Sequence, residues 1–201
     1  MRYVIAGLVF ILAALSVTIG YMVFDRTQIA TTGSNGNVAV GEAFGVDFSL
    51  VDHNGEPISQ EAFRGKPSAI FFGFTHCPEI CPTTLYEIDR WLEALGEDGD
   101  KINAYFVTID PERDTPEVLG DYITSVTQNV IGITGDPEAV REMARGYAVF
   151  FKRIELEDND YTMDHTASIF LLDSAGRFRK TIAYGEVSDT ALAKLRDLAG
   201  T

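Results

Sequence analysis

The chain has 201 residues, 46% of them apolar, and a formal net charge of −14. A chain of this size and composition suits one hydrophobic core rather than two. The acidic balance argues against nucleic acid, which proteins bind through a basic face. Two cysteines are too few for a disulfide-rich scaffold or a four-cysteine zinc site. Any metal site must therefore draw on Cys77, Cys81 and the histidines His53, His76 and His165.

The N-terminal stretch Tyr3–Phe24 contains no charged residue. As a helix it would cross a hydrocarbon core of roughly 30 Å. Positive charge precedes the stretch and the two charges after it cancel, which keeps the N-terminus in the cytoplasm and exports the rest. We predict a single-pass anchor of the inner (cytoplasmic) membrane at 1–26 and a flexible linker at 27–40, with the domain 41–201 in the periplasm or an equivalent exported space. A cleaved signal peptide and a buried core helix are the alternatives.

Strands alternate with helices along the domain, and a hairpin and a helix close it. In chain order, the apolar patterns and capping signals predict a strand at 44–51, a helical turn at 59–63, a strand at 68–74, a helix at 82–95, a strand at 102–109, a helix at 115–126, a strand at 129–134, a helix at 136–147, and strands at 148–156, 168–172 and 177–183 before a helix at 188–199. This order predicts an α/β domain with a mixed central sheet flanked by helices on both faces.

Cys77 and Cys81 lie between the strand at 68–74 and the helix at 82–95, at a strand end where α/β proteins bind ligands. At the start of a helix this spacing puts both thiols on one face, about one turn apart. The helix N-terminus also favours the thiolate form. Three interpretations stay open, namely a structural disulfide, a thiol–disulfide catalyst and a metal site that needs a further ligand. Catalysts of that kind usually have two residues between the cysteines rather than three.

His165 is the candidate for the further ligand, because it lies in a loop directly before the strand at 168–172. We expect this strand to lie beside the cysteine strand. In thioredoxin-fold oxidoreductases the corresponding loop presents a cis-proline, whereas the segment 162–176 has no proline. His76 is expected to point away from its cysteine neighbour, and His53 is expected to be exposed and distant from the site.

Several motifs occur together over about residues 41–198. They are the run Phe72–Pro82 (FGFTHCPEICP), the run Thr108–Pro116 (TIDPERDTP), the pair Asp164-His165 and the pair Tyr184-Gly185. In this combination, and with the N-terminal anchor, the chain resembles the Sco/SenC family of membrane-anchored copper chaperones. The resemblance implies a thioredoxin-like fold and a role in building the binuclear CuA centre of cytochrome c oxidase subunit II.

The resemblance also implies that the family's copper ligands fall on Cys77, Cys81 and His165. Two thiolates and an imidazole suit soft Cu(I), while Cu(II) and Zn²⁺ stay open. A disulfide between the cysteines would abolish copper binding, so we expect the site to be redox-gated. The implied partners are subunit II or its assembly factors, other copper carriers, and the membrane through the N-terminal helix.

Four charged residues are expected to support this site. Asp164 either orients His165 or is a plain turn residue. Asp110, Arg113 and Asp114 follow a strand end on the expected site face. They either brace the copper loop, dock a partner or form a salt-bridged turn.

These observations predict a membrane-anchored copper metallochaperone without turnover chemistry. The first alternative is a thiol–disulfide reductase, with Cys77 and Cys81 as its redox pair, that keeps the CuA-site cysteines reduced. The second is a redox or copper sensor. Copper transfer needs His165 and disulfide exchange does not, so this residue separates the metallochaperone from the reductase.

Overall fold

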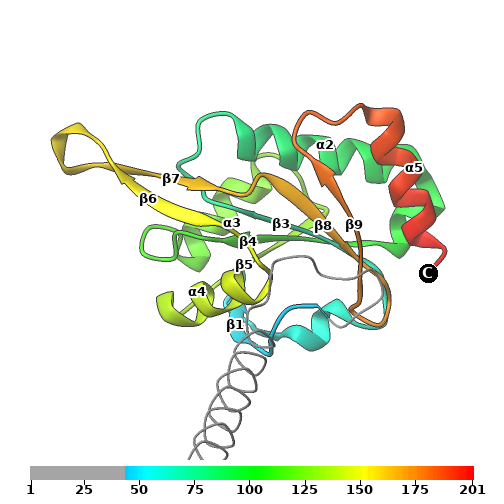
Figure 1. Ribbon diagram of the computed structural model, residues 1–201, viewed down its shortest axis with the longest axis horizontal. Coiled ribbons are helices and arrows are strands. Elements are labelled where there is room, and N and C mark those ends of the chain that lie inside the picture. The colour runs from blue at the N-terminus through cyan, green and yellow to red at the C-terminus, as the bar shows by residue number, and fades with distance from the viewer. Residues whose placement is uncertain (1–43) are drawn as a thin grey trace, which may run out of the picture. The chain divides into compact units, whose positions relative to one another are not determined.

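The computed structural model describes residues 44–201 (Figure 1). Its strands are β1 (Ser49–Asp52), β2 (Pro57–Ser59), β3 (Ser68–Gly73), β4 (Asn103–Thr108), β5 (Val130–Thr134), β6 (Phe151–Glu155), β7 (Tyr161–His165), β8 (Ser168–Leu172) and β9 (Phe178–Ala183). Its α-helices are α2 (Ile80–Leu95), α3 (Pro116–Thr124), α4 (Pro137–Gly146) and α5 (Ser188–Ala199). Short 3₁₀ segments are η1 (Gln60–Phe63), η2 (Gly96–Lys101) and η3 (Glu157–Asn159).

The anchor predicted at 1–26 and the linker predicted at 27–40 lie outside the described residues. Within residues 44–201, none of the helices combines the length and the apolar character that a membrane crossing requires.

The central sheet has seven strands in the order β2-β1-β5-β4-β3-β8-β9. Strands β3, β4 and β5 run parallel to one another. Strand β8 is antiparallel to β3, and β9 is antiparallel to β8. At the other side, β1 pairs antiparallel with both β5 and β2. The predicted mixed sheet is therefore confirmed, and its parallel centre brings the carboxyl ends of β3 and β4 to one edge.

Helices cover both faces of this sheet, as predicted. All six residues of β3 are buried, because packed side chains lie above and below the strand. On one face Phe106 of β4 packs against Phe71 and against Tyr122 of α3. On the other face Phe72 packs against Tyr147, the residue that ends α4. Helices α2 and α5 lie side by side in Figure 1 and contact each other.

Local capping signals explain where two of the helices begin. The Thr115 hydroxyl accepts the Val118 N–H at the start of α3, and Pro116 takes the first helical position. The Asp136 carboxylate accepts two backbone N–H groups at the start of α4. Serine, threonine and aspartate side chains stabilise helix starts in this way, and proline in the first turn costs no hydrogen bond.

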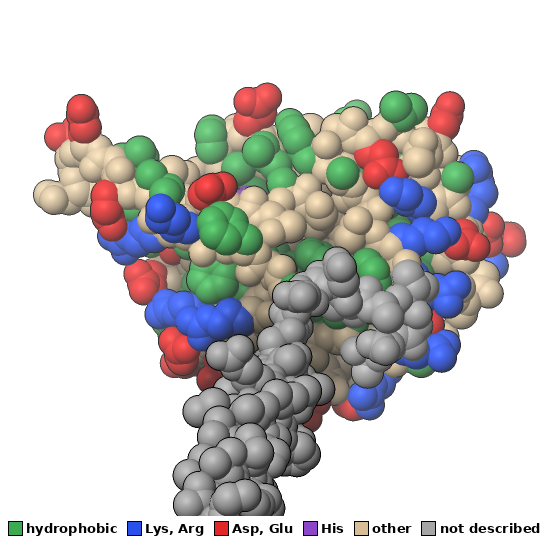
Figure 2. Space-filling model, in the orientation of Figure 1, with side chains coloured by type: hydrophobic (Ala, Val, Ile, Leu, Met, Phe, Trp, Pro, Cys, Tyr) green, Lys and Arg blue, Asp and Glu red, His purple; other side chains and the backbone are tan. Residues whose placement is uncertain are grey.

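The main departure from the predicted elements is a second, two-stranded sheet. The predicted strand at 148–156 contains β6, but Tyr161–His165 forms a strand as well, and the two pair antiparallel. The prediction of a loop at His165 is therefore wrong, because this residue ends β7 and pairs with Phe151. This β6–β7 hairpin projects from the domain in Figure 1. Carboxylates gather toward its tip and basic side chains nearer its base in Figure 2.

Candidate metal centre

The cysteine loop leaves β3 at Gly73, where the chain passes close to the site. A Cβ at this position would stand 2.8 Å from Cys81 Sγ and 2.9 Å from the Phe106 ring, so glycine lets the buried thiol approach the strand. Cys81 lies in the first turn of α2 and is fully buried. Cys77 lies before the helix and is half-buried. The prediction that both cysteines share one helical face is wrong, because α2 begins only at Ile80.

The two thiols are free and interact with each other. Cys77 Sγ accepts the backbone N–H of Cys81 at 3.4 Å. A hydrogen bond from the Cys81 side chain, with a smaller effect from His165, lowers the pKa of Cys77 from 9.0 to about 3 although burial opposes the shift. The same hydrogen bond and burial raise the pKa of Cys81 well above its ordinary value. The hydrogen bond between the two side chains therefore favours the thiolate form of Cys77 and the thiol form of Cys81.

His165 faces this pair from the end of β7. Its Nε2 lies 3.8 Å from Cys81 Sγ, and its ring packs against Phe71 and Phe74. Its Nδ1 lies 3.0 Å from the carbonyl oxygen of Thr166, which can only accept a hydrogen bond. Nδ1 therefore donates to this oxygen, and Nε2 faces the thiols.

The spacing of these donors fits a metal ion in part. A sulfur about 2.3 Å and an imidazole nitrogen about 2.0–2.1 Å from one ion stand roughly 3.5–3.8 Å apart at trigonal or tetrahedral angles. The 3.8 Å separation of Cys81 and His165 matches this spacing. Within residues 44–201, nevertheless, no three His, Cys, Asp or Glu side chains are arranged so that they could hold a metal ion without moving. The cavity beside these groups has a volume of about 260 Å³ and is lined by Cys77 and His165 among others.

The remaining histidines lie elsewhere. His76 is exposed, and its Nδ1 lies 3.1 Å from its neighbour Thr75, away from the thiols. His53 accepts the Gly132 N–H at 2.9 Å through Nδ1, so it is a structural residue between β1 and β5 rather than a freely exposed one.

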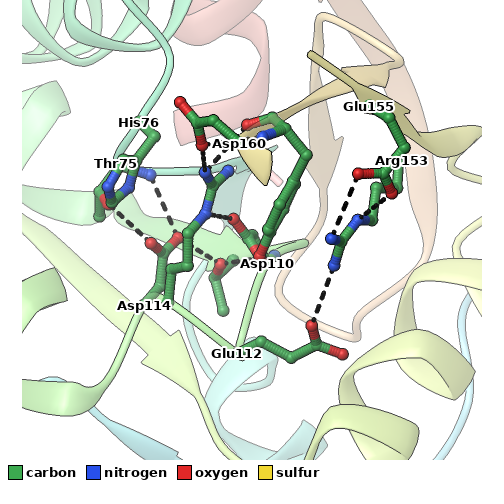
Figure 3. Close-up of polar contacts among 11 residues, drawn as sticks. Thr75, His76, Asp110, Glu112, Asp114, Arg153, Glu155 and Asp160 are labelled. Atoms are coloured by element: carbon green, nitrogen blue, oxygen red, sulfur yellow. Dashed lines mark hydrogen bonds and ion pairs between the residues drawn. The ribbon is translucent and has the colours of Figure 1, made fainter. Parts of the chain in front are cut away.

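Three of the four supporting residues lie next to the site in the turn after β4 (Figure 3). Asp114 is buried and accepts hydrogen bonds from the Thr75 hydroxyl at 2.6 Å and the Thr75 N–H at 3.1 Å. The Thr108 hydroxyl donates to the same carboxylate at 2.6 Å. Burial raises the pKa of Asp114, and these hydrogen bonds oppose the shift. Asp110 and Arg113 form an ion pair of 2.5 Å in the same turn.

Asp164 does not orient His165. It is exposed, as expected where successive strand residues face opposite sides, and the Thr166 carbonyl holds the ring instead. Two residues near the site were missed by the sequence reasoning, Thr75 and Tyr161. Thr75 lies inside the motif that carries the cysteines, so its position was a usable signal. No signal in the sequence pointed to Tyr161, because its segment was not expected to form a strand.

The fold and the site together define a thioredoxin-like α/β protein with a reduced cysteine pair and a histidine at the carboxyl edge of its sheet. The SCO1/SenC family model matches residues 36–200, and the chain belongs to this family. The resemblance seen in the sequence is thereby confirmed.

Individual relatives agree with this assignment. The mitochondrial SCO2 protein of Saccharomyces cerevisiae is 36% identical over 185 residues, which are 90% of this chain and 62% of the yeast protein. The chain therefore spans less than two thirds of that relative. Copper-bound ScoI of Bradyrhizobium japonicum is 43% identical with a TM-score of 0.72, covering 78% of this chain and 99% of that one. Copper-bound yeast Sco1 is 30% identical with a TM-score of 0.72, covering 80% and 90%.

Proposed function

We propose that the chain is a copper metallochaperone that binds copper through Cys77, Cys81 and His165 and helps to assemble the CuA centre of cytochrome c oxidase. The observation that carries this proposal is the approach of His165 Nε2 to within 3.8 Å of Cys81 Sγ, beside a thiolate at Cys77. Two sulfurs and one neutral imidazole are soft enough for Cu(I). The copper bound by the 43% identical ScoI supports the same cargo here.

The unequal thiols suggest an order of loading. The half-buried thiolate of Cys77 meets Cu(I) first, since it is ionised and reachable. Cys81 must lose its proton to become the second sulfur donor, and its raised pKa holds that proton in the free protein. Loading therefore releases a proton and becomes more favourable as the pH rises. Transfer to a partner follows the reverse order, with Cys81 regaining its proton.

The proposal extends to the partners and to the location of the chain. Oxidase subunit II or its assembly factors would receive the copper, and other copper carriers would supply it. The apolar N-terminal stretch supports an anchor at 1–26 in the inner membrane, with the domain 41–201 facing the periplasm or an equivalent space. The family resemblance supports both extensions.

An anaerobic Cu(I) titration of the reduced full-length chain against a competing chelator tests the ligand set. We expect one tight copper per chain and a loss of affinity of about 10- to 100-fold in His165→Ala. His76→Ala is the matched control, because this exposed histidine is adjacent to Cys77 and contacts neither thiol. Copper binding that is equally tight in His165→Ala would refute the three-ligand site.

A second candidate function is thiol–disulfide reduction of the CuA-site cysteines. The observation that favours it is the pairing of a reachable thiolate at Cys77 with a buried thiol at Cys81, which are the roles of an attacking and a resolving cysteine. Reduction of a model disulfide should survive His165→Ala, whereas tight copper binding should not. Reductase activity with copper binding indifferent to His165 would favour this second function.

A further inference from the structure

The two halves of the candidate centre come from segments far apart in the chain. Cys81 belongs to α2, and His165 ends the β6–β7 hairpin 84 positions later. Neither strand of the hairpin pairs with the seven-stranded sheet, and the hairpin projects from the domain (Figure 1). Strand β7, which ends at His165, therefore forms no strand-to-strand hydrogen bonds with the central sheet, and such bonds do not hold His165 in place. The chain enters β8 of that sheet at Ser168, three residues after His165, and side-chain contacts between the hairpin and the domain add to this tether.

Tyr161 makes several of these contacts. It lies on the same face of β7 as His165, since the two are four positions apart along the strand. Its hydroxyl donates to Asp110 Oδ1 at 2.7 Å. Its ring lies against the Arg113 guanidinium of the domain and the Arg153 guanidinium of its own hairpin, each with its central carbon 3.6 Å from the ring centroid. Arg113 also donates to the Tyr161 carbonyl oxygen at 2.9 Å.

The turn that receives Tyr161 is the turn that holds the cysteine loop. Asp110 and Arg113 bind the hairpin, while Asp114 accepts two hydrogen bonds from Thr75, which lies in the cysteine loop (Figure 3). The turn is itself closed by hydrogen bonds from the Arg113 and Asp114 N–H groups to the Asp110 carbonyl. One short segment of five residues thus joins both halves of the centre.

On the basis of the proposed function, we propose that Tyr161 is a positioning residue that keeps His165 beside the cysteine pair by anchoring the hairpin to the turn 110–114. Because the anchored hairpin already holds the imidazole beside the cysteines, copper binding does not have to order the hairpin. Loosening Tyr161 should weaken the contribution of His165 and leave the two sulfur donors in place. The turn sets the separation of the two halves, with Thr75 as the contact on the cysteine side.

The experiment is a double-mutant cycle on the reduced full-length chain, read by anaerobic Cu(I) competition. Tyr161→Phe removes the hydrogen bond to Asp110, and Tyr161→Leu removes the stacked ring as well. We expect losses of copper affinity of about 3-fold for the first and up to about 10-fold for the second, neither larger than the loss in His165→Ala. In a His165→Ala background both losses should vanish, because the anchor acts only through that imidazole. Copper X-ray absorption of Tyr161→Leu should show a weakened copper–nitrogen contribution.

Two comparisons keep the outcomes distinct. Tyr86→Phe is the matched control, since Tyr86 is 57% exposed on α2, and it should leave affinity unchanged. Thr75→Val removes the hydroxyl contact on the cysteine side, and its loss of affinity should persist in the His165→Ala background. Unchanged affinity in His165→Ala would defeat the proposed function itself. A weakened His165→Ala together with an unaffected Tyr161→Leu, or a Tyr161→Leu loss that persists without His165, would overturn the positioning role alone.

Discussion

The thiolate at Cys77 leads to a sharp prediction about reactivity in acid. Its pKa is lowered from 9.0 to about 3, so the thiol should stay ionised at pH 5, where an ordinary cysteine is almost wholly protonated. At pH 5 about one ordinary thiol in 10⁴ is a thiolate, so Cys77 carries roughly 10⁴ times more of the reactive form. At pH 7 the thiolate fraction of Cys77 is about 10² times that of an ordinary cysteine.

This advantage is partly offset, because a thiolate of low pKa is a weaker nucleophile. With a Brønsted slope of about 0.4–0.5, a shift of about six units lowers the intrinsic rate by roughly 10²·⁴ to 10³. Cys77 should therefore react with a neutral disulfide about 10- to 40-fold faster than an ordinary cysteine at pH 5, but about 3- to 10-fold slower at pH 7. The order of reactivity should thus reverse near pH 6.

Stopped-flow kinetics measure the rate at which the reduced chain first reacts with a neutral aromatic disulfide. The chain unfolded in urea supplies the ordinary cysteines as an internal reference, and absorbance at 240 nm reports the thiolate directly. Between pH 7 and pH 5 the folded rate should stay nearly constant while the unfolded rate falls about 100-fold. Cys81→Ala should restore an ordinary pH dependence to Cys77, because the Cys81 hydrogen bond is the largest cause of the shift. A folded rate that falls in parallel with the unfolded rate would refute the thiolate assignment.

Three further predictions concern stability. Since its folded pKa of about 3 is below the ordinary 9.0, the Cys77 contribution is fully present above pH 9 and lost as the pH falls toward 3. The stability difference between the reduced chain and Cys77→Ala, from urea titrations, should therefore shrink on acidification; a constant difference would contradict the shift. Gly73→Ala should lower unfolding free energy by about 1–3 kcal/mol, because the added Cβ meets Cys81 Sγ at 2.8 Å; Gly200→Ala, which meets only a backbone oxygen at 3.6 Å, is its control. Phe71→Ala should cost about 3–5 kcal/mol in the same titrations, since this fully buried ring supports His165; a cost below about 1 kcal/mol would show that the site can collapse around it.

The sheet and most helices could be predicted from the sequence because their signals are local. Strand β3 is a nearly continuous apolar run, which is typical of a strand covered on both faces. Helix α3 carries its cap and its proline at the expected positions. Helix α2 was harder to delimit, since its N-cap residue Glu79 makes no side-chain capping hydrogen bond. The predicted start near Pro82 is later than the observed start at Ile80, and the wrong relation between the two cysteines came from treating Cys77 as part of the first helical turn.

The β6–β7 hairpin could be predicted only in part because its second strand has no local signature. The acidic run that ends at Asp160 reads as a solvated loop, and the strand after it mixes polar and apolar residues without a continuous apolar run. What holds the strand is its pairing with β6 and the two guanidinium groups against Tyr161. Both depend on contacts with residues distant in sequence.

The candidate centre shows the same division between what a motif can and cannot specify. The motifs identified the candidate donor side chains, and the family resemblance indicated that they belong together. Their unequal ionisation depends on how closely the two cysteines approach, with Cys77 Sγ accepting the Cys81 N–H at 3.4 Å. The ring orientation of His165 depends on the Thr166 carbonyl at 3.0 Å, which no motif contains. A site that takes up and releases the same ion needs donors that are close but not locked together. A hydrogen bond between two sulfurs, with an imidazole on a separately anchored hairpin, meets that requirement, and for this reason the geometry adds to the motif rather than repeating it.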